Sequence, residues 1–193
     1  MFEGLLDLAS AFGLSTSAGL NAYIPLLTVA ILGRFTPLVQ LEEPWAALTS
    51  AWIIGLLAVL LAIELLADKI PAIDTVNDVI QTVIRPTAGA ILFASTTQSS
   101  LHIHPLLAMG CGVILAGSVH AIKAGGRPVV TATTGGTANP VVSTIEDVVA
   151  TVTSFIAIVF PSLVLGWIFL VVLLAYLIVR RRRLRREGAV RNG

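Results

Sequence analysis

Charged residues are scarce in this chain, and their scarcity limits the kind of protein it can be. Of its 193 residues, 12% are charged and 56% are hydrophobic, whereas about 25% of an average soluble domain is charged. A sequence this apolar is not that of an ordinary soluble domain. It predicts an integral membrane protein that forms one compact bundle.

Cysteine and histidine are almost as rare. Cys111 is the one cysteine, which excludes an intrachain disulfide and a cysteine-built metal site, and its apolar neighbours predict a buried, inert thiol. His102 and His104 lie two residues apart and far from His120, unlike the spacing of a histidine-built zinc site. The Walker, Gly-x-Ser-x-Gly and His-Glu-x-x-His patterns do not occur. We therefore expect neither an enzyme nor a resident cofactor.

The few bases of the chain are concentrated at its C-terminus. Residues 180–193 carry seven Arg and one Glu, whereas residues 1–179 carry five bases against ten acids. We interpret 180–193 as a basic cytoplasmic tail that anchors the topology and contacts anionic membrane lipids. Because no aromatic residues interleave with these arginines, we expect no nucleic-acid partner.

Residues 1–179 divide into apolar runs that predict an all-α, polytopic membrane helix bundle, a single transmembrane domain of about six spans. Prolines inside and between the runs predict broken or kinked helices. The segment 124–139 is rich in Gly and Thr, and we expect it to be a loop packed into the bundle or lining a cavity. The expected spans are 5–33, 47–67, 72–96, 105–123 and two spans between 140 and 179 that meet at Phe160-Pro161.

The charges also predict an orientation. With six spans, Lys69, Lys123, Arg127 and the tail fall on one side, and the acidic pair of the loop 34–46 falls on the other. The positive-inside rule then places both termini in the cytoplasm. Five spans would put the three bases opposite the tail, so six spans fit better.

Two parts of the chain resemble each other. The stretches PAIDTVNDVIQTVI (71–84) and PVVSTIEDVVATVT (140–153) align without a gap and share six residues: one Pro, one Asp, two Thr and two Val. This similarity predicts an internal helix–break–helix repeat with units of about 51–96 and 105–160, an arrangement typical of transporters. Shared composition of two amphipathic helices is the alternative explanation.

Charged residues inside the predicted spans are the main site candidates, because charge in a membrane interior is costly. Clustered carboxylates suit a cation or a proton relay, and we expect a small transporter or channel-like permease for an ion or small polar solute. A structural bundle in which acids and bases simply pair is the alternative. The sequence does not decide whether these residues bind a metal ion. The candidate ion-binding residues are Glu64, Asp68, Asp74, Asp78, Glu146 and Asp147, with Lys69 and Arg85 setting their charge state.

The Gly- and Thr-rich segment supports a second hypothesis. Backbone amides freed by Gly, Thr hydroxyls and basic side chains suit the phosphate of an anionic lipid or of a lipid-linked substrate. The candidates for that role are Lys123, Arg127, Thr131, Thr133 and Thr134.

Polar and small residues also interrupt the first apolar run. Ser17 and Asn21 share a helix face, and Tyr23 and Pro25 follow, so we expect a polar patch with a kink or break near the proline. Helix packing is the simpler reading of this patch, and a functional role is the alternative. Glycines in the run 105–123 suit close packing within one chain or between copies, which leaves a homo-oligomer open.

Three passages resemble a known family. GLSTSAGLNAYIPLL (13–27), ELLADKIPAIDTVNDVIQTVIRPTAGAI (64–91) and GGRPVVTATTGGTANPVVSTIED (125–147) are similar to the bacterial membrane-protein family catalogued as domain of unknown function 4126. The resemblance covers nearly all of the chain except the arginine tail. It implies a location in the bacterial inner (cytoplasmic) membrane and brings no settled activity.

Overall fold

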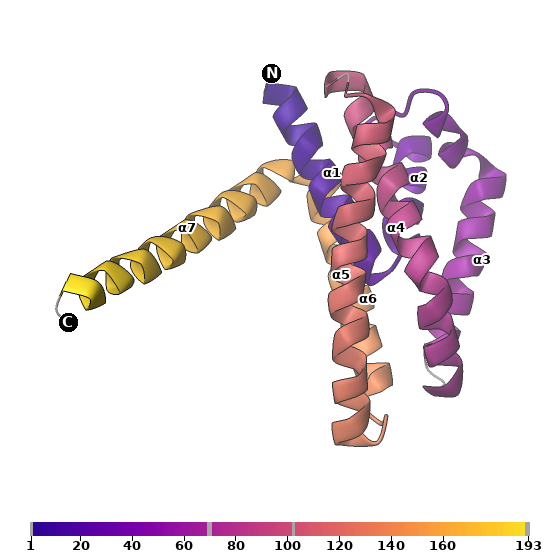
Figure 1. The fold of residues 1–193 in the computed structure, drawn as a ribbon. Helices are drawn as coiled ribbons and strands as arrows, with labels where there is room; N and C mark the ends of the chain where they lie inside the picture. The colour runs from indigo at the N-terminus through magenta and orange to yellow at the C-terminus, as the bar shows by residue number, and fades with distance from the viewer. Residues whose placement is uncertain (1, 69–70, 102, 192–193) are drawn as a thin grey trace.

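The computed structural model describes residues 2–68, 71–101 and 103–191, and every regular element in this part of the chain is a helix (Figure 1). The prediction of an all-α protein is therefore confirmed. The elements are α1 (Phe2–Leu20), α2 (Tyr23–Phe35), the 3₁₀ helix η1 (Trp45–Thr49), α3 (Ala51–Ala67), α4 (Pro71–Leu101), α5 (Pro105–Thr134), α6 (Asn139–Val159) and α7 (Pro161–Arg191).

Helix α1 lies at the centre and packs against α4, α5, α6 and the start of α7. Its buried face consists largely of Ala, Ser and Gly, which let neighbouring backbones approach closely. Three buried serines donate hydrogen bonds to backbone carbonyls of other helices. Ser10 Oγ donates to Ala157 O (2.7 Å), Ser15 Oγ to Gly89 O (3.0 Å) and Ser17 Oγ to Ala150 O (2.8 Å).

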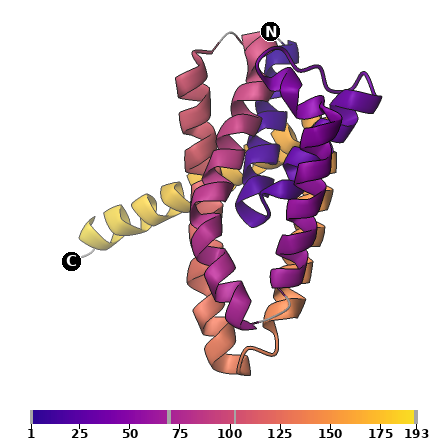
Figure 2. The same ribbon diagram turned by 90° about the vertical axis from the view of Figure 1, so that its right-hand side faces the viewer.

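Helices α1 and α2 form a hairpin that turns back inside the bundle (Figure 2). The chain breaks at Asn21-Ala22, four residues before the proline at which we expected the break. Residues 37–41, which follow α2, share a pocket with Glu3 and Asp7 at the start of α1. The run 5–33 is therefore two antiparallel helices and not one span. Helix α2 has 13 residues, which at 1.5 Å per residue is about 20 Å, too short to cross a bilayer.

The bundle has two ends, which we call the loop end and the turn end. The loop end carries residues 36–50, the start of α1 and the end of α4, where Trp45 Nε1 donates to Gln98 Oε1 (2.6 Å). The turn end carries residues 135–138 between α5 and α6 (Figure 1). The start of α1 lies at the loop end, whereas Arg127 lies near the turn end, and the expected orientation across a membrane stays a prediction.

Helices α4 and α5 cross at two glycines. A Cβ atom built on Gly89 would lie 2.5 Å from Ala116 Cβ and 2.6 Å from Gly112 O, and one built on Gly112 would collide with the backbone of Gly89. Such backbone-to-backbone contact is possible only where both partners lack side chains.

The outward surface of the bundle is apolar. Trp52 is 90% exposed, and large aliphatic side chains cover the outer faces of α3, α5 and α6. Many of the charged side chains are instead buried, which is the reverse of a soluble protein. Among the described residues, α5 and α6 are long and apolar enough to cross a membrane, and α2, α3 and the start of α7 are shorter apolar helices.

The helix boundaries decide several of the local predictions. The break at Phe160-Pro161 is confirmed, because α6 ends at Val159 and α7 begins at Pro161. The loop expected at 124–139 is wrong for most of its length, since α5 continues to Thr134 through Pro128 and only a short turn follows. Helix α4 likewise continues to Leu101. Cys111 is exposed and not buried.

Helix α7 leaves the bundle. Its first turns pack on α1 and α6, and the rest projects away from the other helices (Figure 1). The arginine-rich segment is the continuation of this helix, which runs to Arg191.

The glycine crossing yields a stability prediction. Gly112→Ala should destabilise the protein by about 1–3 kcal/mol, because the added methyl group has no space against the α4 backbone. Thermal unfolding of the full chain in detergent, followed by far-ultraviolet circular dichroism, measures the effect. Gly110→Ala is the matched control, since a methyl group added there would meet nothing within 4 Å. Equal melting temperatures for both variants would show that the crossing is looser than described.

Candidate functional site

Polar and charged side chains, most of them buried, gather between the tip of the α1–α2 hairpin and the turn end. The break after α1 and the helices α2 to α6 all contribute to the group, which we call the polar cluster. Its members are Asn21, Tyr23, Glu64, Asp68, Asn77, Gln81, Thr82, Arg85, His120, Lys123, Arg127, Ser143, Glu146 and Asp147. Burying charged side chains costs free energy unless each is paired, so the contacts within the cluster determine whether it is stable.

The first part of the cluster is an ion pair in the middle of the bundle. Arg85 Nη2 lies 3.0 Å from Glu64 Oε1, and the two side chains are 0% and 1% exposed. Arg85 Nη1 lies 3.1 Å from His120 Nδ1, and His120 Nε2 lies 3.1 Å from Thr82 Oγ1. Residues from α3, α4 and α5 are joined in this way.

The arginine determines the tautomer of His120. A guanidinium group only donates hydrogen bonds, so His120 Nδ1 must accept. The ring proton then lies on Nε2, which donates to the Thr82 hydroxyl. His120 is accordingly a neutral imidazole in this arrangement, and a second proton on the ring would break its contact with Arg85.

The second part of the cluster is centred on Asp68, directly after α3. Its Oδ1 accepts from Asn77 Nδ2 (3.0 Å), and its Oδ2 accepts from Ser143 Oγ (2.6 Å). Arg127 Nη2 lies 3.7 Å from the same Oδ2. Asp68 therefore connects the beginnings of α4 and α6, the two segments that resemble each other in sequence.

The third part holds the end of α1. Lys123 Nζ lies 2.8 Å from Glu146 Oε2 and donates to Leu20 O (3.0 Å), one of the carbonyls left without a helical partner where α1 stops. Arg127 Nη2 also approaches Glu146 Oε2 at 3.5 Å. A basic side chain at a helix C-terminus also complements the helix dipole.

Asn21 occupies the hairpin tip and contacts both of its sides. Its Oδ1 accepts from the backbone amides of Tyr23 (3.0 Å) and Ile24 (3.1 Å), at the start of α2. Its Nδ2 donates to Asp147 Oδ1 on α6 (3.0 Å). One side chain thus caps α2 and positions a buried carboxylate.

Three buried atoms beside the Glu64–Arg85 pair have no hydrogen-bond partner among the described residues. They are Glu64 Oε2, Gln81 Oε1 and Arg85 Nε. The Tyr23 phenol lies within hydrogen-bonding reach of the Gln81 side chain and near both charges. Two acceptors and one donor therefore remain unsatisfied at the hairpin tip, where buried polar groups normally have partners.

The structure brings most of the predicted residues together, although by two routes. Glu64, Asp68, Glu146 and Arg85 join the network of α3 to α6, and Asp147 joins it through Asn21. Ser17 lies one helical turn before Asn21, toward the loop end, and its Oγ is 2.8 Å from Ser154 Oγ. Three predicted members cannot be placed, because Lys69 lies outside the described residues, as do the side chains of Asp74 and Asp78.

The predicted anion site is arranged differently from the expectation. Thr133 and Thr134 donate to the carbonyls of Val129 and Val130 within α5, and Thr131 pairs with Asn139. The amides of this segment up to Thr134 are part of a helix, so the expected loop does not present them to a ligand. Lys123 and Arg127 face Glu146 and Asp68.

Sequence reasoning gives too little weight to several residues. It considers His120 only in arguing against a zinc site, and it places Gln81 between Asp78 and Arg85 on one stripe of a helix without giving it a role. Ser143 could have been found, because it takes the position of Asp74 when the two similar segments are aligned. No group of three or more His, Cys, Asp or Glu side chains suited to a metal ion occurs in the described part of the chain.

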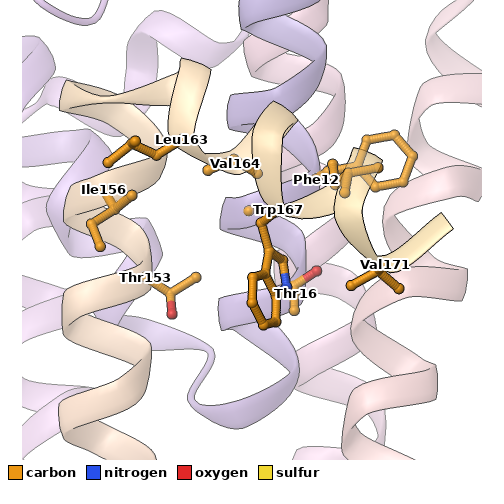
Figure 3. A pocket seen from close by; sticks show the side chains of 10 residues that line it. Phe12, Thr16, Thr153, Ile156, Leu163, Val164, Trp167 and Val171 are labelled. Carbon is orange, nitrogen blue, oxygen red and sulfur yellow. The ribbon is translucent and has the colours of Figure 1, made fainter. Parts of the chain in front are cut away.

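Two grooves of similar size open on the surface of the bundle. One lies between α1, α6 and α7, where apolar side chains such as Phe12, Ile156 and Trp167 line about 610 Å³ (Figure 3). The other lies between α2, α3 and α6 and has about 680 Å³. The second differs in having Asp147 in its wall.

The buried pair predicts a specific pattern of stabilities. Arg85→Gln should cost about 3–5 kcal/mol, because Glu64 would be left charged and buried without its partner. Adding Glu64→Gln should recover much of that loss. The midpoints of denaturant-induced unfolding in micelles for the two single variants and the double variant form the test. Arg34→Gln, which removes an exposed arginine that bonds Thr49 O, serves as the control. Strictly additive costs would contradict a coupled pair.

Comparisons with known proteins agree with the resemblance noted in the sequence. No curated protein and no solved structure matches the chain significantly. A family model described as a domain of unknown function (DUF4126) matches residues 8–181, which includes every helix that contributes to the polar cluster. The chain therefore belongs to the DUF4126 family.

Proposed function

We propose that this protein is a multi-pass permease of the bacterial inner membrane that passes an ion or small polar solute through the polar cluster. The membrane location is supported by the exposed apolar surface and by the two helices long enough to cross a bilayer. Transport is supported by the combination of a re-entrant hairpin with buried charge at its tip. Irregular backbone at membrane depth is tolerated where protein or a watery cavity surrounds it.

The helix order suggests a topology for the proposed protein. The hairpin enters from the loop end and returns to it, and α3, α4, α5 and α6 then run alternately between the two ends. Helix α7 begins at the loop end, so a crossing by α7 would bring the arginine tail to the side of Arg127. We propose five crossings and a hairpin in place of six spans, with the C-terminus in the cytoplasm as the positive-inside rule requires.

The three unsatisfied atoms carry the proposal. Glu64 Oε2 and Gln81 Oε1 accept hydrogen bonds, and Arg85 Nε donates one. A species with two hydrogen-bond donors and one acceptor, such as water, complements this set. Because a buried carboxylate bridged to water can take up and release a proton, the proton is the first species to test.

The test is proton flux into proteoliposomes driven by a potassium diffusion potential and read by an internal pH-sensitive dye. The wild type should acidify the vesicles, and Glu64→Gln should reduce the flux to the level of protein-free liposomes, because its side chain cannot be ionised. Glu43→Gln removes an exposed carboxylate of the loop end and should leave the flux unchanged. Equal flux for the wild type and Glu64→Gln would contradict a path through this residue.

A structural role is the second candidate, and one observation favours it. Described bases of the cluster each face a carboxylate, as in Glu64–Arg85 and Glu146–Lys123. A purely structural cluster predicts no proton flux in wild-type vesicles, although Glu64→Gln would still lower the unfolding midpoint. The same two measurements therefore separate the candidates.

A further inference from the structure

We propose that the groove between α1, α6 and α7 (Figure 3) binds an uncharged, ring-bearing lipid of the quinone class, whose ring oxygens hydrogen-bond to Thr16, Thr153 and Trp167. This site is separate from the polar cluster. It depends on the proposed membrane location, because such a ligand would enter from the bilayer, but it requires no proton flux through Glu64.

The groove has the size and the lining of a small-molecule site. Its volume of about 610 Å³ is within the range of typical ligand sites, about 300–1,000 Å³. Ile156 of α6 and Leu163, Ile168 and Val171 of α7 supply much of its apolar wall. None of the described residues that line it has an ionisable side chain, so a charged ligand would lose its hydration here without gaining a counter-ion. The groove therefore favours an uncharged ligand that is largely apolar.

Two threonine hydroxyls in this groove are available to a ligand. A threonine hydroxyl inside a helix commonly bonds the carbonyl one turn earlier, as Thr151 Oγ1 does with Asp147 O at 2.8 Å. In contrast, Thr16 Oγ1 and Thr153 Oγ1 hydrogen-bond to none of the described residues. Thr16 belongs to α1 and Thr153 to α6, so two of the three helices each present an unbonded hydroxyl to the groove.

The third helix contributes the indole of Trp167, whose N–H likewise bonds no residue in the described part of the chain. An indole N–H can only donate, whereas a hydroxyl can donate or accept. The ligand must therefore bring an acceptor to Trp167, and either a carbonyl or a hydroxyl oxygen satisfies the threonines. A quinone carries two such oxygens on one ring, and so does its reduced form.

Two aromatic side chains favour a flat ring as the part of the ligand that enters the groove. Phe12 of α1 and Trp167 of α7 both line it (Figure 3). The Phe12 ring packs edge to face on Phe93, with centroids 5.5 Å apart and an angle of 69° between the planes. A ring held in this way gives a ligand ring a fixed surface to pack against. A saturated acyl chain would gain apolar contact but would leave the three polar groups unpaired.

The position of the groove favours entry from the lipid side. Leu163 and Trp167 are 60% and 66% exposed and belong to the apolar outer surface. The tail of a bound lipid would extend past these side chains into the bilayer. The groove between α2, α3 and α6 offers a different combination, because Asp147 is in its wall and the hydroxyl of Thr28 bonds Ile24 O within its own helix.

The experiment is equilibrium binding of decylubiquinone to the purified full-length protein in detergent, measured by isothermal titration calorimetry after subtraction of the heats from protein-free micelles. The wild type should bind saturably with one site per chain. The double variant Thr16→Val/Thr153→Val should weaken binding at least about tenfold, or about 1.4 kcal/mol, because both threonine hydrogen bonds to the ligand are lost. Its unfolding midpoint should match that of the wild type, since neither hydroxyl has a hydrogen bond to lose within the described structure.

Matched variants test the location of binding. Leu163→Trp places a large side chain on the rim of this groove and should abolish binding, whereas Val152→Trp does the same on the rim of the other groove and should not. Both positions are at least 50% exposed, so neither variant overfills the core. Thr28→Val removes a threonine hydroxyl from the other groove and should leave binding unchanged.

Two further compounds test the chemistry of the ligand. Decylbenzene has a ring and a tail but no ring oxygen, and dioleoylglycerol has ester carbonyls but no ring, so both should compete much more weakly than decylubiquinone. Glu64→Gln should bind the quinone as the wild type does, and the double threonine variant should keep the wild-type proton flux, which separates this site from the proton path.

The proposal is overturned if the wild type does not bind decylubiquinone, or if the double threonine variant or Leu163→Trp binds it as tightly as the wild type. Equal competition by decylbenzene would show that the polar groups play no part, and equal competition by dioleoylglycerol would identify an acyl-lipid site in place of a quinone site. Loss of binding in Glu64→Gln would place the ligand in the polar cluster and would also contradict the proposal.

Discussion

The rest of the structure depends on one broken helix. Where α1 stops at Leu20 inside an apolar bundle, its last carbonyls and the first amides of α2 lose their helical partners, and the buried interior of the bundle supplies no bulk water to replace them. Lys123 bonds the Leu20 carbonyl and Asn21 bonds the amides of α2. Once a lysine is buried for this purpose it needs a counter-charge, which Glu146 supplies. The other buried charges extend this arrangement toward the turn end.

Close packing makes the break possible. A hairpin can enter the bundle only if its neighbours leave room, and the room comes from small residues on the helices around it. Gly19 of α1 touches Ala116 and Val119 of α5, while Gly89 and Gly112 bring α4 against α5. Serines on α1 then bond carbonyls of α4 and α6, which fixes the depth of α1 as well as its spacing.

The sequence predicts the helical class, the apolar runs and the break at Phe160-Pro161, because each depends on local composition or on a proline. It also identifies many cluster members, because charge in an apolar chain is conspicuous. It does not predict the hairpin, since Asn21 breaks the helix only through contacts with α2 and α6. Nor does it predict that Gly125 to Thr134 stay helical, since Gly, Thr and an internal proline have weak helix propensity and most of this segment is exposed. The pairing of Asp68 with Ser143 and of Arg85 with His120 joins residues far apart in the chain, and no local pattern encodes such pairs.

The hairpin tip also lies between Asp147 and the Glu64–Arg85 pair. Asn21 contacts Asp147 in the wall of one groove, and Tyr23, two residues later, reaches Gln81 beside the Glu64–Arg85 pair. A small shift of the tip would therefore change the surroundings of two carboxylates at once. Coupling of this kind needs an element with two arrangements. Asn21, which bonds Asp147 and the first amides of α2, and Tyr23, which reaches Gln81, together connect the two carboxylates through the tip.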